Sequence, residues 1–162
     1  MTNDKTPRTN HPVNPVKKEF RQDEHDVQDV SELTRKVIGC AYKVHNRLGF
    51  GFLESVYEKS LMVELNRKGI SAVAQEPIKV RYDGVIVGDF IADLLIENRL
   101  IIELKSITRL VQAHEVQLVN YLTATGIEQG LLINFGPEKV EVKRKYKTFR
   151  PHQNHPVNPV EE

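Results

Sequence analysis

The stretch IADLLIENRLIIELKSI, residues 91–107, decides the fold because it holds two apolar runs separated by three polar residues. Apolar runs that flank turn residues predict the two strands of a β-hairpin. Three charged residues nevertheless stand within these runs: Asp93, Glu103 and Lys105. Charged side chains are rarely buried unless they are paired or bind a metal, so their place in the most hydrophobic part of the chain requires a reason.

The spacing within this hairpin predicts where the charged side chains point. Side chains alternate between the two faces of a strand, so Glu103 and Lys105 share a face. A three-residue loop over residues 97–99 places Asp93 opposite Glu103, whereas a two-residue loop puts the carboxylates on opposite faces. We expect the three-residue loop, with Asn98 or a neighbour at positive φ. Two carboxylates and one ammonium group then cluster on one face of the sheet.

The clustered charges have two interpretations. Adjacent carboxylates repel each other, so they share a proton or recruit a cation. Mg²⁺ takes oxygen ligands, commonly one or two carboxylates together with waters and substrate phosphate. Lys105 beside such an ion could hold or help to deprotonate an attacking water. The alternative is a structural salt bridge between carboxylate and lysine, and the spacing alone does not decide between them.

Composition limits the class of protein. The chain has 162 residues and a net charge of +1, which suits one domain whose basic surface, if any, is local. The single cysteine, Cys40, excludes an intramolecular disulfide and is expected to be a small core residue. No apolar run approaches the length of a membrane span, so we expect a soluble, cytoplasmic protein that does not bind membranes.

The chain is expected to form a single domain over residues 29–149, between disordered tails at residues 1–28 and 150–162. Each tail carries the heptapeptide NHPVNPV, at residues 10–16 and 154–160. The duplication indicates either a pair of short docking tags or repeated genomic sequence that is read through at both ends.

Hydrophobic periodicity and glycine positions predict the elements. In chain order we expect two helices, four strands, a helix and two strands, which is a mixed α/β domain with helices packed on a sheet. Asp29 and Glu32 have capping-box spacing at the start of the first helix. The later helices are expected over residues 53–68 and 111–125. The strands are expected over residues 78–82, 85–87, 130–135 and 139–147, in addition to the central hairpin.

Polar side chains on the later helices are further candidates. Glu54 and Tyr57 share a face of the second helix, although the helix dipole also favours a glutamate in the first turn. His114, Gln117 and Tyr121 form one stripe on the third helix, and their groups suit hydrogen bonds to a phosphate backbone or to metal-bound water. The alternative for this stripe is an ordinary solvated face.

Basic residues are concentrated near the C-terminus. Runs of this kind are often solvated edge strands, which lysine protects against aggregation, but beside a metal site they could hold a polyanion. The residues are Lys139, Lys143, Arg144, Lys145, Lys147 and Arg150.

Three of these motifs together resemble a known group of proteins. Gly51, Glu54 and Tyr57 spell G-x-x-E-x-x-Y. Asp93, followed by Glu103, Leu104 and Lys105, is similar to the split acidic signature of the PD-(D/E)XK nuclease superfamily. Gln117 and Tyr121 match the Q-x-x-x-Y of its RecB-like branch. The chain therefore resembles the GxxExxY proteins of that superfamily over residues 30–147, with Ala92 where a proline is nominal.

The resemblance implies a restriction-endonuclease-like fold, with a mixed β-sheet flanked by helices, and a set of residue roles. The implied catalytic residues are Glu54, Asp93, Glu103 and Lys105. The implied ligands of Mg²⁺ or Mn²⁺ are Asp93, Glu103, the Leu104 carbonyl and, through water, Glu54. The implied substrate-binding residues are Gln117, Tyr121, Tyr57 and His114.

The implied function is metal-dependent hydrolysis of phosphodiester bonds in nucleic acid, with DNA favoured over RNA as the partner. The alternative is a catalytically silent module on the same fold that binds nucleic acid or protein. A third option is a structural protein in which the charges form a salt-bridge cluster. A homodimer and an unknown protein partner both remain open.

Overall fold

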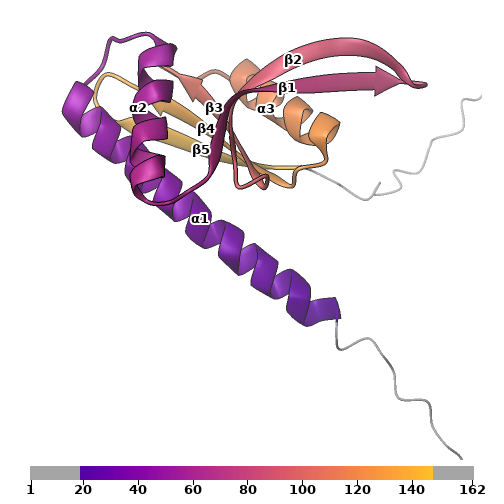
Figure 1. Ribbon diagram of the computed structural model, residues 1–162. Helices are drawn as coiled ribbons and strands as arrows, with labels where there is room; N and C mark the ends of the chain where they lie inside the picture. The colour runs from indigo at the N-terminus through magenta and orange to yellow at the C-terminus, as the bar shows by residue number, and fades with distance from the viewer. Residues whose placement is uncertain (1–18, 148–162) are drawn as a thin grey trace, which may run out of the picture.

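The computed structural model describes residues 19–147, and it describes side chains from Asp29 onward (Figure 1). Both copies of the heptapeptide, the tail over residues 150–162 and Arg150 lie outside this part of the chain. No helix within residues 19–147 is both long enough and apolar enough to cross a membrane.

The described residues form three helices and five strands around one sheet. In chain order they are α1 (Glu19–Leu48), α2 (Glu54–Arg67), β1 (Ala72–Tyr82), β2 (Val85–Ile96), β3 (Leu100–Lys105), α3 (Gln112–Thr125), β4 (Gln129–Phe135) and β5 (Val140–Tyr146). The sheet order is β1-β2-β3-β4-β5, with β3 and β4 parallel and the other neighbours antiparallel.

Two predictions about the elements are wrong. Residues 85–87 and 91–96 are not separate strands, because Gly88 and Asp89 pair with β1 and keep β2 continuous. The first helix does not begin at Asp29 but extends back to Glu19, through a stretch without glycine or proline. The Asp29 carboxylate instead accepts a hydrogen bond from the Arg99 guanidinium at 2.7 Å.

The helices cover opposite faces of the sheet (Figure 1). α1 and α2 pack on one face, where Val37, Leu61 and Ile102 belong to the larger apolar core. The predicted core residue Cys40 lies in this core and is fully buried. α3 packs on the other face, where Leu118 and Leu122 form a smaller core with strand residues. The sheet is therefore buried on both sides at its centre.

The loop of the central hairpin has the predicted length. Ile96 pairs with Leu100, which leaves a three-residue loop. Glu97 and Asn98 have φ angles of 50° and 56°, so the expected positive φ is present at Asn98 and at its neighbour. The loop therefore sets the register that the prediction of a carboxylate pair required.

β1 and β2 share a kink at Gln75 and Asp93, where their pairing skips one residue on each strand. Gln75 has a φ of 56°, in the left-handed region that extended strand residues avoid. Leu94 contacts the core beneath α1 and α2, whereas Ala92 contacts the core beneath α3. Residues two apart in a regular strand share a face, so the kink exchanges the faces of the hairpin. The outer part of the β1–β2 hairpin, which runs from the kink to the turn and comprises residues 76–92, thereby faces α3.

Candidate active site

The pairing of β2 with β3 ends at the kink, and Asp93 lies one residue beyond the last pair, Leu94 with Ile102. The Asp93 carboxylate accepts a hydrogen bond from the backbone N–H of Leu104 at 2.7 Å. A side chain therefore continues the connection where the backbone ladder has stopped. This bond fixes the carboxylate beside the end of β3, next to Glu103.

Glu103 lies at the centre of the site and has only 4% of its surface exposed. Lys105 extends from the same face, and its Nζ lies 3.6 Å from Glu103 Oε1. Glu103 Oε2 is buried and accepts no hydrogen bond from the described residues. A buried carboxylate oxygen without a donor is costly, so this atom favours a cation or a proton at that position.

The electrostatics of the two carboxylates agree with this geometry. Burial and, to a smaller extent, the Asp93 carboxylate raise the pKa of Glu103 to about 7, against the opposing effect of Lys105. Burial also raises the pKa of Asp93, against the hydrogen bond from Leu104. The pair is therefore short of positive charge despite the nearby lysine.

The start of α2 contributes two more carboxylates. Glu54 is exposed, yet it lies close enough to raise the pKa of both Asp93 and Glu103. Glu58 likewise raises the pKa of Asp93. The Ser106 hydroxyl, just after β3, donates a hydrogen bond to the carbonyl of Phe52 at 2.7 Å. This bond ties the segment before α2 to the end of the strand that carries Glu103.

The prediction that Tyr57 binds substrate does not fit its position. The side chain is fully buried and stacks on Phe135 with ring centroids 4.3 Å apart. Its hydroxyl donates to the carbonyl of Gly49 and accepts from the N–H of Phe52. Tyr57 thus holds the turn that precedes Glu54. Glu54 and Tyr57 share a helix face in spacing, but only Glu54 reaches the site.

The three residues of the predicted stripe on α3 make different contacts in the structure. Gln117 donates a hydrogen bond from Nε2 to the Tyr121 hydroxyl at 2.7 Å. Tyr121 is only 5% exposed, so the interpretation of this stripe as a solvated face is wrong. Burial raises the pKa of Tyr121, Gln117 opposes it, and Glu103 and Asp93 add to the increase. Tyr121 therefore lies within electrostatic reach of the carboxylate pair.

His114 has a local role in the structure. Its imidazole Nδ1 accepts a hydrogen bond from the backbone N–H of Val111 at 3.2 Å. The backbone N–H of His114 donates to the Val111 carbonyl at 3.1 Å. This reciprocal pair caps the first turn of α3. The prediction that His114 binds substrate gains no support from this position.

The donor set fits a hard divalent cation. Among the side chains described, from Asp29 to residue 147, no group of three or more His, Cys, Asp or Glu is placed to enclose a metal ion. Mg²⁺ does not need such a cage, because it keeps several waters and commonly uses one or two carboxylates with substrate phosphate. Asp93 and the unpartnered Oε2 of Glu103 supply that number of carboxylates. The oxygen ligands of the pair therefore suit a hard divalent cation.

The basic segment lies beside the same face of the sheet. Glu103 pairs with Leu132 of β4, which in turn pairs with Lys143 of β5. Lys143 is exposed and shares this cross-strand row, roughly 10 Å from Glu103 at the usual strand spacing. Lys145 forms an ion pair with Glu115 of α3. Part of this basic strand can therefore face a polyanion at the acidic pair.

Sequence reasoning missed two supporting residues. Asn134 is fully buried in β4, and its amide donates to the carbonyl of Ile107 and accepts from its N–H. It thereby anchors the loop that follows Lys105, and a lone polar residue within an apolar strand was its signal. Gln75, which lies at the kink, donates a hydrogen bond of 2.5 Å to the Glu58 carboxylate. A glutamine in an alternating strand gave no signal for that conformation.

Fold and site together define a class: a mixed α/β domain with a carboxylate pair and a lysine at the end of two central strands. The family described as the PD-(D/E)XK nuclease superfamily matches residues 31–145. The chain belongs to this superfamily, and the predicted restriction-endonuclease-like α/β fold is confirmed. Its members generally use divalent metals, although some members are inactive.

One solved structure is similar to part of the chain. A solved structure described as "Crystal structure of SSO0001" is 19% identical, with a TM-score of 0.47 over 58% of this chain and 50% of that chain. The chain thus spans about half the length of that protein. No curated protein matches the sequence.

Proposed function

We propose that the protein is a nuclease that uses Mg²⁺ or Mn²⁺ to hydrolyse phosphodiester bonds in nucleic acid, with DNA as the expected substrate. The observation that carries the proposal is the buried Oε2 of Glu103, which accepts no hydrogen bond from the described residues and lies beside a second carboxylate and a lysine. The superfamily to which the chain belongs supports the same chemistry. Within it, we place the chain among the GxxExxY proteins of the RecB-like branch.

Each residue of the site has a role in this proposal. Asp93 and Glu103 would hold the ion, with the Leu104 carbonyl as a further ligand and Glu54 acting through water. The ion, when bound, neutralises charge at the phosphoryl oxygens and makes a bound water more acidic. Lys105 would hold the attacking water.

The pair on α3 would position the substrate backbone. The Tyr121 hydroxyl accepts its hydrogen bond from Gln117, so its own proton remains available for donation to a phosphate oxygen. Lys143, in the same row as Glu103, would add a positive charge for the backbone. Binding of the backbone by such groups carries no sequence information.

The test is a metal titration of the wild type and of Glu103→Gln, with cleavage of single- and double-stranded DNA and RNA followed in parallel. We expect cleavage that requires Mg²⁺ or Mn²⁺ in the wild type and is lost in the variant. Divalent metal should also raise the melting temperature of the wild type, because a ligand that binds only the native state stabilises it.

A matched control separates chemistry from folding. Glu64 is a buried glutamate of similar exposure, at 5%, but it lies on α2 and pairs with Lys43 and Arg67. Glu64→Gln should change stability and leave metal-dependent cleavage in the folded fraction intact. Metal binding without cleavage in the wild type would favour the silent binding module. Absence of both would identify the carboxylates as a structural cluster.

A further inference from the structure

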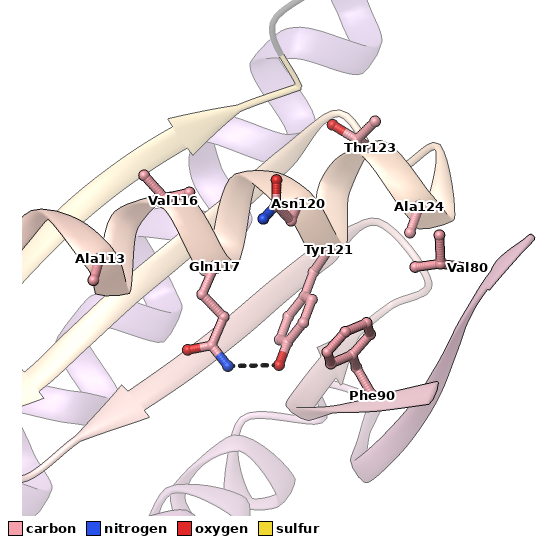
Figure 2. Close-up of a pocket in the computed structure, with 9 residues that line it drawn as sticks. All are labelled: Val80, Phe90, Ala113, Val116, Gln117, Asn120, Tyr121, Thr123 and Ala124. Carbon is pink, nitrogen blue, oxygen red and sulfur yellow. Dashed lines mark hydrogen bonds between the residues drawn. The ribbon is translucent and has the colours of Figure 1, made fainter. Parts of the chain in front are cut away.

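A cavity of about 470 Å³ opens between α3 and the outer part of the β1–β2 hairpin (Figure 2). Phe90 and Val80 line it from the strands, and Gln117, Asn120 and Tyr121 line it from α3. Its size falls within the usual range for small-ligand sites, and its wall combines apolar surface with a few polar groups. The kink that turns the outer hairpin toward α3 creates this space.

Phe90 presents an aromatic face to the cavity. Its side chain is 45% exposed, and its ring centroid lies 5.8 Å from that of Tyr121. A Cβ at Gly88 would lie 2.8 Å from the Phe90 ring, so the absence of a side chain there leaves room for the ring. The ring is therefore seated against its own strand, with part of its surface open to a ligand (Figure 2).

The polar groups on the wall lie on α3. Gln117 points into the cavity beside Tyr121, and Asn120 lies one turn along the helix (Figure 2). The Asn120 side chain makes no hydrogen bond to the described residues, so its amide is available to a ligand. An aromatic face next to amide donors and acceptors matches a nucleobase, which has a flat π face and a hydrogen-bonding edge. An aliphatic side chain of a protein partner would leave these amides unused.

Tyr121 connects the cavity to the carboxylate pair. Its ring lines the cavity and also packs in the smaller core with Ala92 and Ile101. Those residues precede Asp93 and Glu103 by one and two positions, respectively. The two carboxylates are near enough to influence the Tyr121 hydroxyl. A strand with a phosphate at the acidic pair could therefore place a neighbouring base in the cavity.

We propose that this cavity receives an unpaired base of the nucleic-acid strand whose phosphate lies at the acidic pair, with the base stacked on Phe90. The inference rests on the proposed function and specifies its substrate as single-stranded nucleic acid. Within a duplex, both faces of a base are covered by its neighbours, so the base cannot enter without leaving the stack. Stacking on an aromatic ring tolerates any base, which predicts weak sequence preference.

The test measures binding and cleavage with fluorescently labelled single-stranded DNA, its duplex, and single strands with one abasic site at each successive position. Binding is measured by anisotropy in Ca²⁺, and cleavage in Mg²⁺. The variants are Phe90→Ala and Tyr42→Ala. Tyr42 is a matched control, because it is an aromatic residue of similar exposure, 46%, on α1.

The expected result has three parts. The wild type binds the single strand more tightly than the duplex, and Phe90→Ala weakens single-strand binding about tenfold, the scale of one lost base–aromatic stack. Tyr42→Ala leaves the affinity unchanged. With the wild-type protein, a single strand that has an abasic site at one position next to the cleaved bond shows the same loss of affinity.

Other outcomes overturn the inference in distinguishable ways. Cleavage that is indifferent to Phe90→Ala and to every abasic site would reject the base pocket and leave the nuclease proposal standing. Single-strand binding that depends on Phe90 without cleavage would uphold the pocket and reject the nuclease. A wild type that binds no nucleic acid rejects both. A change of oligomeric state in Phe90→Ala at unchanged affinity would show a protein interface instead.

Discussion

The Asp93 carboxylate and the backbone N–H of Leu104 are joined by a 2.7 Å hydrogen bond across two strands whose pairing has already ended. The bond links the kink in β2 to the end of β3 and holds both carboxylates of the site in one place. The same carboxylate therefore has a structural bond and, in our proposal, a metal-binding task. The two can be separated by mutation.

Asp93→Asn should keep the fold and lose the chemistry. An asparagine oxygen can still accept the Leu104 N–H, so we expect a free energy of unfolding within about 1 kcal/mol of the wild type. Asp93→Ala leaves that buried N–H without an acceptor and should cost about 1–3 kcal/mol. Urea denaturation without metal measures both values, and a metal titration should show no stabilisation of Asp93→Asn. Equal stability of the two variants would contradict a structural role for the bond.

Glu103 should make the metal-free protein less stable as the pH rises. Its pKa is raised to about 7 in the folded state, so the native protein binds more protons than the unfolded chain above the ordinary carboxyl range. The stabilising contribution is complete below the unfolded pKa and is lost as the pH approaches 7. Glu103→Gln should lack this loss and be more stable than the wild type at pH 8 by roughly 3 kcal/mol at most.

The measurement is urea denaturation of both proteins between pH 5 and pH 8 in a chelator. Asp93, whose pKa is also raised, acts in the same direction in the wild type. Divalent metal should reverse the trend, because it binds the ionised carboxylates. Parallel pH profiles for the two proteins would show that Glu103 is ionised throughout.

The sequence predicted the central hairpin because loop length and side-chain alternation are local rules. Ile96 and Leu100 flank three polar residues, and a three-residue loop fixes the register in which the two strands pair. The carboxylate pair follows from that register. The predicted helix boundaries near Gly69 and Gly126 agree with the structure for a similar reason, since both glycines have positive φ at a helix end.

The rest of the site depends on contacts that spacing cannot give. Glu54 and Tyr57 share a helix face, but spacing does not say that this helix buries Tyr57 against Phe135 and leaves Glu54 exposed. Gln75 adopts positive φ without being a glycine, an asparagine or an aspartate. The surrounding sheet imposes this conformation, so the local sequence pattern does not predict it.

Tyr57→Phe should destabilise the protein although it changes one atom. The hydroxyl donates to the Gly49 carbonyl and accepts from the Phe52 N–H, and its loss leaves both groups without this partner. We expect a decrease of about 1–2 kcal/mol in the free energy of unfolding, measured by urea denaturation. Tyr42→Phe is the control, because Tyr42 is nearly half exposed and should lose almost nothing. Equal effects would mean that the hydroxyl of Tyr57 is dispensable.

Gly130→Ala should weaken the packing of α3 on the sheet. A Cβ at this position would lie 2.8 Å from a methyl carbon of Leu118 and 3.2 Å from the Ile101 carbonyl. We expect a loss of about 1–3 kcal/mol, typical of an overpacked core. Gly39→Ala is the opposite case, since Gly39 lies within α1 and its Cβ would meet nothing within 4 Å. That variant should gain about 0.5–1 kcal/mol, and thermal unfolding can rank all three proteins.

At position 75, glycine should give a more stable protein than alanine, whereas extended positions of the same strand should show the reverse. Its φ of 56° strains any residue with a Cβ, at a cost on the order of 1 kcal/mol. Both Gln75→Gly and Gln75→Ala remove the hydrogen bond to Glu58, so the difference between them reports the backbone alone. We expect Gln75→Gly to be the more stable by about 1 kcal/mol.

Lys79, an extended residue of the same strand, gives the control pair. Lys79→Gly should be less stable than Lys79→Ala by about 0.5–1 kcal/mol, because glycine loses more backbone entropy in a strand. Both variants lose the ion pair with Asp89, so this contact cancels. The same order at both positions would mean that the kink is not strained. Opposite orders would show that the sheet holds Gln75 in this conformation opposite Asp93, where the kink ends the ladder and leaves the carboxylate to bond Leu104.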